Sequence, residues 1–337
     1  MRPAVATTPA KLPEMALDER AGSQAASFSM RGAAPADLET CAAIWRTATN
    51  DYMRRLNLLE IPDDLGPILR LYRHLLAVDR DGFVVAEQSG AGKASQIVAF
   101  VSAVRREALW FLSMLFVLPG AQGAGLGRAL LSQVLPTEPD VALATCTDSV
   151  QPISNALYGS LGIVPRMPLF RLVGLVDRAS ELTPLPSGIR PVPFDDIIGG
   201  VGGLGIRALD DELDGLDRVA IGIQHRIDHD FVRAEGRAGF LYCGPDGRPL
   251  GYGYASEAGR VGPVAVADPE LLPAVLAHLV TTVAARGAYG IWLPGGGAAM
   301  PGLLRAGFRI DGFPVLLCWD RPFAQFDRYV PISPGLL

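Results

Sequence analysis

Residues 115–131 read LFVLPGAQGAGLGRALL. An apolar run ends at Pro119, four glycines follow within eight residues, and the pattern then becomes that of the first turns of a helix. Glycine permits positive φ and lets a ligand approach the main chain closely. The free N–H groups at a helix start point outward, and the helix dipole strengthens their attraction for an anion. The stretch therefore predicts a loop that holds a phosphorylated ligand.

The two most familiar phosphate-binding motifs do not fit this spacing. Counted from Gly120, a P-loop requires Lys where Leu126 stands. A dinucleotide fingerprint requires glycine where Arg128 stands if it begins at Gly123, and where Leu130 stands if it begins at Gly125. A competing interpretation is a tightly packed helix start that binds nothing. A plain helix start would use one Ser, Thr or Asp cap, whereas glycines inside a helix cost about 0.5–1 kcal/mol each.

A third motif fits. Residues 122–127, QGAGLG, match Q/R-x-x-G-x-G/A, the pyrophosphate loop of the GNAT N-acetyltransferase superfamily. Downstream, NALYGSLG supplies Asn155, Tyr158 and Gly162 of the N-x-x-Y-x-x-x-G element of that family. The chain thus resembles a GNAT protein through specific motifs over residues 28–172, and through the order of its elements alone over residues 188–320.

The resemblance implies how acetyl-CoA, the acyl donor, would bind. Its pyrophosphate would lie on the amides of residues 122–127, and its pantetheine arm would follow the end of the preceding strand. The Val117 amide would donate to the thioester carbonyl as an oxyanion donor, and Tyr158 would protonate the leaving thiolate, so these two are the expected catalytic residues. The expected acetyl-CoA contacts are Leu115, Val117, Gln122, Gly123, Ala124, Gly125, Leu126, Gly127, Arg128, Asn155 and Tyr158.

Simpler roles remain open for the two residues of the second motif. Tyr158 is alternatively a packing aromatic on a helix. Asn155 lies three residues earlier on the same helix face, where it would hydrogen-bond the pantetheine or the neighbouring strand, or else cap the helix.

The general base is not identified. Some GNAT relatives carry a Glu about six residues before the Val117 position, but Phe111 stands there. Glu107 is a weak substitute and Asp148 is no better, while a chain of water molecules would serve equally well. Tyr52, Glu60, Asp63 and Asp64 fall in the segment expected to build the acceptor pocket, where carboxylates would suit a cationic amine; a solvated loop explains them as well.

The element order repeats after a linker. MRGAAPADL at 30–38 is echoed by IRPVPFDDI at 189–197, with Arg followed six residues later by Asp in each. We therefore expect an α+β protein of two tandem GNAT acyltransferase folds, each a mixed, mostly antiparallel sheet flanked by helices. The expected parts are a disordered tail (1–27), a GNAT domain that binds acetyl-CoA (28–172), a linker (173–187), a degenerate GNAT-like domain (188–322) and a C-terminal extension (323–337).

The second copy lacks the phosphate loop. Its counterpart, VAVADPELLP at 264–273, has no glycine and places Asp268 and Glu270 where phosphates would lie. Met300 and Leu303 take the positions of the motif Asn and Tyr. We expect no cofactor in this copy. It would cover the sheet edge of the first copy, complete the acceptor cleft or form a homodimer surface. GGVGGLG at 199–205 indicates a hinge or loop.

His225 and His229 in HRIDHD are four residues apart, the spacing of metal ligands on one helix face. No third ligand lies nearby in the sequence, so we expect polar or capping roles and no metal.

Composition narrows the partners and the location. The 337 residues carry a net charge of −5 with scattered basic residues, which does not favour nucleic acid. No apolar run reaches the roughly 18 residues of a membrane span, so we expect no membrane partner. Four widely spaced cysteines and the absence of a signal-peptide core favour a cytoplasmic protein with reduced thiols.

Taken together, the residues and the resemblance predict an acetyl-CoA-dependent N-acetyltransferase. It would transfer acetyl to a primary amine of a small molecule or peptide by direct attack. The alternatives are an inactive acyl-CoA-binding sensor or scaffold and, less well matched, a nucleotide-binding domain.

Overall fold

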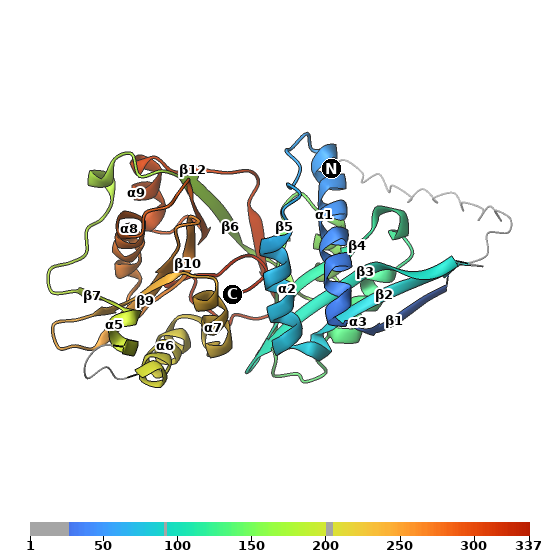
Figure 1. The fold of residues 1–337 in the computed structure, drawn as a ribbon, viewed down its shortest axis with the longest axis horizontal. Helices are drawn as coiled ribbons and strands as arrows, with labels where there is room; N and C mark the ends of the chain where they lie inside the picture. The colour runs from blue at the N-terminus through green and yellow to red at the C-terminus, as the bar shows by residue number, and fades with distance from the viewer. Residues whose placement is uncertain (1–26, 91–92, 200–204) are drawn as a thin grey trace, which may run out of the picture.

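The computed structural model describes residues 27–90, 93–199 and 205–337. It has two lobes with a long sheet running through both (Figure 1). We call residues 27–174 the front half and residues 190–337 the rear half. The predicted tail lies outside the described residues except for Ser27, which begins the first strand. Most of the predicted loop at 199–205 also lies outside the described residues.

The front half follows the predicted order of a strand, two helices, a hairpin and a β-α-β-α-β unit. Asp37 precedes the first helix as expected, although its carboxylate receives hydrogen bonds from Arg31 and the Ala34 amide instead of capping the helix. The elements are β1 (Ser27–Gly32), α1 (Leu38–Arg55), α2 (Gly66–Val78), β2 (Phe83–Gly90), β3 (Lys93–Arg106), β4 (Leu109–Val117), α3 (Leu126–Val134), β5 (Ala142–Asp148), α4 (Pro152–Gly159) and β6 (Val164–Gly174).

Helices cover both faces of the front-half sheet (Figure 1). Successive side chains of a strand point to opposite faces. Phe100 of β3 therefore packs in the core under α1 and α2, whereas Val101 packs with Leu126 and Leu130 of α3. An apolar run such as β3 is explained by burial on both faces.

The rear half repeats this plan with one additional helix before its hairpin. Its elements are β7 (Arg190–Pro193), α5 (Phe194–Gly199), α6 (Gly205–Ile221), α7 (Arg226–Ala234), β8 (Ala238–Cys243), β9 (Pro249–Ala255), β10 (Arg260–Val266), α8 (Leu272–Thr282), β11 (Tyr289–Pro294), α9 (Ala299–Ala306), β12 (Arg309–Ile310), β13 (Val315–Trp319) and β14 (Tyr329–Val330).

The two halves exchange strands, which the sequence did not predict. The sheet order is β1-β2-β3-β4-β5-β13-β6-β11-β10-β9-β8-β7, so the late strand β13 lies between β5 and β6. Val315 of β13 pairs with Asp148 on one side and with Leu169 on the other. The front half therefore depends on the rear half to complete its sheet.

Candidate active site

A cavity of about 1300 Å³ lies where β4 and β5 diverge. The parallel pairing of these strands runs from Leu109–Ala142 to Leu112–Thr145 and stops there. Beyond that point residues 113–117 of β4 line the cavity, together with α1, the start of α3, and α4. The rear half and the C-terminal segment 332–335 close the other side.

The open edge of β4 presents main-chain groups to the cavity. Leu118 N donates to Val98 O of β3 at 2.8 Å. Because N–H groups alternate between the two sides of a strand, those of Val117 and Leu115 face away from β3, toward the gap. They can pair with an extended ligand arm.

The glycine loop leaves a row of amides free at one end of the cavity. Gly123 and Gly125 have φ of +85° and +77°, and Gly125 precedes α3 as its N-cap. The N–H groups of residues 123–128 make no hydrogen bond to another described residue, since the first helical bond runs from Ala129 N to Gly125 O. Such a row of N–H groups at a helix start is an anion-binding arrangement.

Gln122, Gly123, Gly125, Leu126, Gly127 and Arg128 line the cavity, whereas Ala124 does not. Gln122 has an additional role within the fold, because its Nε2 donates to Val117 O at 3.0 Å. This bond connects the loop to the open strand edge.

Tyr158 and Asn155 lie on α4, beside the gap. Tyr158 is buried in the core under α3 and also lines the cavity. Burial raises the pKa of its hydroxyl, so the group keeps its proton at neutral pH. Asn155 is inside the helix and not at its N-cap, which is Gln151. Its Nδ2 donates to Gln151 O at 2.8 Å and to Asp148 O at 3.0 Å, so it connects the start of α4 to the neighbouring strand. Asn155 is not among the cavity-lining residues.

A tyrosine and a carboxylate meet where α1 and the end of β5 line the cavity. The Tyr52 hydroxyl of α1 donates to Asp148 Oδ2 at the end of β5, and both residues line the cavity. Burial raises the pKa of the Asp148 carboxyl above its usual value, and the hydrogen bond from Tyr52 offsets part of this rise. Asp148 can therefore accept a proton inside the cavity.

The other acidic candidates lie elsewhere. Glu107 is not among the cavity-lining residues and pairs with Arg218 at 2.8 Å. Glu60 and Asp63 pair with Arg54 and Arg46 at 3.6 and 2.6 Å. Asp64 Oδ1 accepts a hydrogen bond from the Gly66 amide. Within the segment 50–66, Tyr52 lines the cavity together with three residues not singled out from the sequence, namely Asp51, Arg55 and Leu56.

The rear counterpart of the glycine loop binds its own carboxylate. Asp268 Oδ1 accepts a hydrogen bond from the Glu270 amide at 3.0 Å. The amide that would face an anion is thus already paired. Met300 and Leu303 belong to α9, as the alignment of the two copies predicts.

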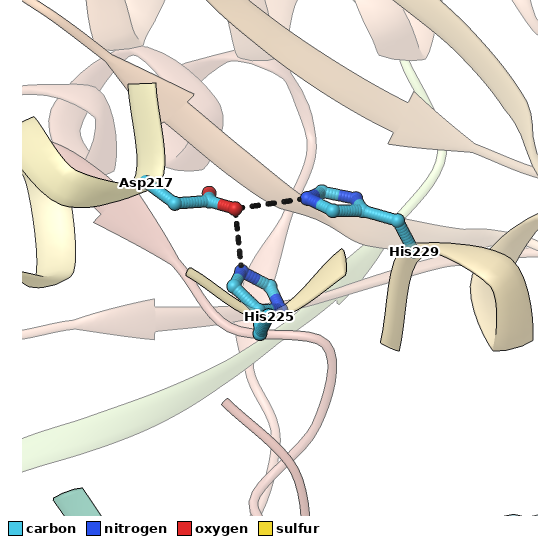
Figure 2. A group of neighbouring side chains, drawn as sticks. All are labelled: Asp217, His225 and His229. Atoms are coloured by element: carbon cyan, nitrogen blue, oxygen red, sulfur yellow. Dashed lines mark hydrogen bonds and ion pairs between the residues drawn. The ribbon is translucent and has the colours of Figure 1, made fainter. Parts of the chain in front are cut away.

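His229 of α7 and His225, the N-cap residue before α7, do have a third neighbour, so one premise of the sequence prediction was wrong. Asp217 of α6 points at both rings (Figure 2). Its Oδ2 lies 3.0 Å from His229 Nε2 and 3.2 Å from His225 Nε2. Tyr252 donates to the other carboxylate oxygen, and the Tyr254 hydroxyl lies 3.0 Å from His229 Nδ1. The three side chains have the composition of a metal site, yet their hydrogen bonds already form a connected network.

His225 Nδ1 lies 3.8 Å from Asp228 Oδ2, and Asp228 extends this network to the front half. Asp228 of α7, next to His229, receives two hydrogen bonds from Arg106 of β3 at 2.7 and 2.8 Å. His74 Nε2 of α2 lies 2.7 Å from Asp228 Oδ1. Asp228 is 1 % exposed, and although burial alone would raise its pKa, Arg106 and His74 hold the pKa below the usual value.

Residues 44–163 match the sequence model of the acetyltransferase (GNAT) family. The chain therefore contains a GNAT acetyltransferase domain, and this domain carries the glycine loop, the diverging strands and α4. A comparison with curated protein sequences finds no significant match.

Solved structures resemble the chain over nearly its full length. A presumed acetyltransferase from Pyrococcus horikoshii has a TM-score of 0.66 at 15% identity, with 96% of this chain and 100% of that chain covered. A GCN5-related N-acetyltransferase from Sphaerobacter thermophilus has a TM-score of 0.55 at 18% identity, covering 88% and 96%. A tandem GNAT protein from the clavulanic acid biosynthesis pathway has a TM-score of 0.52 at 14% identity, covering 87% and 98%. These similarities confirm the predicted fold class, a mixed, mostly antiparallel sheet flanked by helices in a two-domain GNAT arrangement.

Among the described helices, none has the length and apolar content needed to span a membrane. The four cysteines are free thiols.

Proposed function

We propose that this GNAT-family chain is an acetyl-CoA-dependent N-acetyltransferase that transfers acetyl to a primary amine of a small molecule or peptide. The observation that supports it most is the sharing of one cavity by a row of free amides, an open strand edge and a buried carboxylate. A sensor or scaffold would require the first two features alone.

The loop residues fit a diphosphate. A Cβ added at Gly127 would meet only Leu157 and Val117 side-chain atoms, at 3.9 Å, and no positive φ is needed there. The protein itself therefore leaves room for a side chain at Gly127, and a ligand lying against the main chain would explain the glycine. The cavity also exceeds the roughly 300–1,000 Å³ of a single-ligand pocket, which supports two substrates side by side.

Bound acetyl-CoA would supply an activated thioester, and the residues around it would stabilise and orient the reacting groups. The pantetheine arm would hydrogen-bond along β4 at Leu115 and Val117, and the Val117 N–H would donate to the thioester oxygen as negative charge develops there. Tyr158 holds its proton at neutral pH, so it can give it to the departing sulfur.

Asp148 is the proposed base. An amine arrives mostly protonated and must lose a proton before it can attack. Asp148, with its raised pKa, is matched to this transfer better than an ordinary surface carboxylate. Tyr52 would fix the orientation of the carboxylate through its hydrogen bond.

The test is release of free thiol from acetyl-CoA in the presence of a broad panel of primary amines. We expect amine-dependent thiol release and an acetylated product detected by mass spectrometry. Binding of acetyl-CoA without thiol release across the panel would instead support the sensor. Calorimetry with CoA, ATP and NAD separates both from a nucleotide-binding domain.

The proposal also covers the cellular location and the oligomeric state of the protein. The four free thiols support a cytoplasmic location. A homodimer remains a prediction that sedimentation would test.

A further inference from the structure

The rear half contributes an unbalanced set of charges to the cavity. Its charged lining residues are Glu235, Arg237 and Arg260. Arg171 of β6, at the end of the front half, also lines the cavity and pairs with Asp311 at 2.8 Å. Two arginines against one glutamate leave the rear-half lining with a surplus of one positive charge by simple count. On the side of the GNAT motifs, Asp51 and Asp148 are matched in number by Arg55 and Arg128.

The Glu235 carboxylate lies between the arginines at the rear-half end of the cavity. Glu235, 5 % exposed, lies 2.9 Å from Arg237 Nη2, 2.8 Å from Arg260 Nη1 and 3.5 Å from Arg70 Nε. Burial alone would raise the pKa of Glu235, but Arg237 and Arg260 outweigh it and hold the pKa below its usual value. Glu235 therefore stays ionised and positions the arginines without neutralising them all.

Donors remain free on these arginines. Arg237 is 3 % exposed through its side chain, and its buried Nε has no hydrogen-bond partner among the described residues. Arg260 is 39 % exposed and makes its side-chain hydrogen bonds to described residues through Nη1. A buried cation with unused donors beside a cavity favours an anionic ligand, because charge-assisted hydrogen bonds to oxyanions are the strong ones.

We propose that the acceptor carries a carboxylate or phosphate group, which Arg260, Arg237 and Arg171 bind at the end of the cavity away from the transferred acetyl group. The proposal rests on the proposed acetyl transfer and gives its acceptor a chemical class: an amine with a remote oxyanion. Asp148 and Asp51 would face the amine.

The sheet gives the approximate length of such an acceptor. From Asp148 on β5, two strand steps lead through β13 to Arg171 on β6, and two more lead through β11 to Arg260 on β10. Neighbouring strands lie about 4.8 Å apart, so these strands are roughly 10 and 19 Å away. An extended peptide advances about 3.3–3.6 Å per residue, so an acceptor of about three to six residues, or a small molecule of that length, spans the gap.

Calorimetry on the full chain saturated with CoA tests this directly. The probes are peptides of two to six residues with a free amino terminus, each made with a C-terminal carboxylate and with a C-terminal amide. We expect the acid form to bind at least tenfold more tightly than the amide at one or more lengths above two residues. Equal affinity of the two forms at every length, or binding of neither, overturns the proposal.

Arginine variants test whether these side chains bind an anionic group of the acceptor or a phosphate of the acyl donor. Arg260→Gln should remove most of the preference for the acid form while leaving CoA affinity unchanged. Arg286→Gln is the matched control, since Arg286 pairs with Glu257 on the surface, outside the cavity. A loss of CoA affinity in Arg260→Gln would mean that the arginines bind phosphates of the donor, which also overturns the proposal.

Turnover by the same peptides separates this inference from the proposed function. Thiol release without a preference for the acid form leaves acetyl transfer intact and refutes the anionic acceptor. Tight, selective binding of acids without thiol release refutes acetyl transfer to these amines and keeps the anion site. Arg237→Gln, which risks misfolding because the residue is buried, is interpreted only where its melting temperature matches that of the wild type.

Discussion

The Tyr52 hydroxyl donates a hydrogen bond to Asp148 Oδ2, which lies 96 positions away in the sequence, and both residues line the cavity. This bond joins α1 to the end of β5, where the sheet opens. A carboxylate that is buried yet held ionisable by one hydroxyl is suited to receive a proton from an arriving ammonium group.

Asp148→Asn should lower kcat/KM for the amine by about 10²–10⁴-fold, the usual contribution of a positioned general base. The amide keeps the shape of the side chain but cannot accept the proton. CoA affinity, measured by calorimetry, should not change. Glu107→Gln is the control, because Glu107 lies outside the cavity lining. Equal activity of Asp148→Asn and wild type would assign the proton transfer to water.

Tyr52→Phe should shift the pH profile. The ionised form of Asp148 is the active form, so kcat/KM falls as pH is lowered through its pKa. Removing the Tyr52 donor destabilises the charged carboxylate and raises that pKa further. The acid limb of kcat/KM should therefore move to higher pH relative to wild type with the same acceptor. A lower rate with an unmoved acid limb would indicate a packing role alone.

Tyr158→Phe tests the proposed acid. The variant lacks the proton for the leaving sulfur and should lose about 10²-fold or more in kcat, while acetyl-CoA binding persists. Its melting temperature serves as the control, since Tyr158 is also a core residue. Full activity in a stably folded Tyr158→Phe would leave Tyr158 as a packing aromatic.

Asp228→Asn should destabilise the fold by about 1.5–3 kcal/mol, because the buried Arg106 loses one of its two charged partners and keeps Asp79 as the other. Chemical denaturation measures the loss. Glu257→Gln, which breaks an exposed pair, should cost no more than about 1 kcal/mol. A small effect of Asp228→Asn would show that the two halves do not depend on this network.

The same network gives a pH dependence. The pKa of Asp228 is lower in the folded protein than in the unfolded chain, so its stabilisation is present above pH about 4 and is lost as pH falls below that. Stability should decline in acid less steeply in Asp228→Asn than in wild type.

Added zinc should not raise the melting temperature if Asp217, His225 and His229 act as a hydrogen-bond network; a clear rise would identify them as metal ligands.

Local patterns and long-range contacts differed in how well the sequence predicted them. The glycine loop and the elements around it depend on spacing within about 20 residues, and the helix-strand order followed from periodicity. The strand exchange involving β13, the bond between Tyr52 and Asp148, and the approach of Asp217 to both histidines depend on pairings between distant segments. Such pairings leave no periodic signal in one sequence. Asp148 was noticed as a carboxylate after a strand, but nothing local marked it above Glu107.

Coenzyme A binding to the wild type and to Gly127→Asp tests the central claim most directly. Aspartate fits the fold at this position but places a negative charge against the free amides of the loop. Gly287→Asp, also in open space but in the rear half, is the matched control. We predict one CoA per chain, its diphosphate on residues 122–128 in a crystal structure, and affinity lost in Gly127→Asp but kept in Gly287→Asp. A diphosphate bound near residues 264–273, or unchanged affinity in Gly127→Asp, would contradict the account.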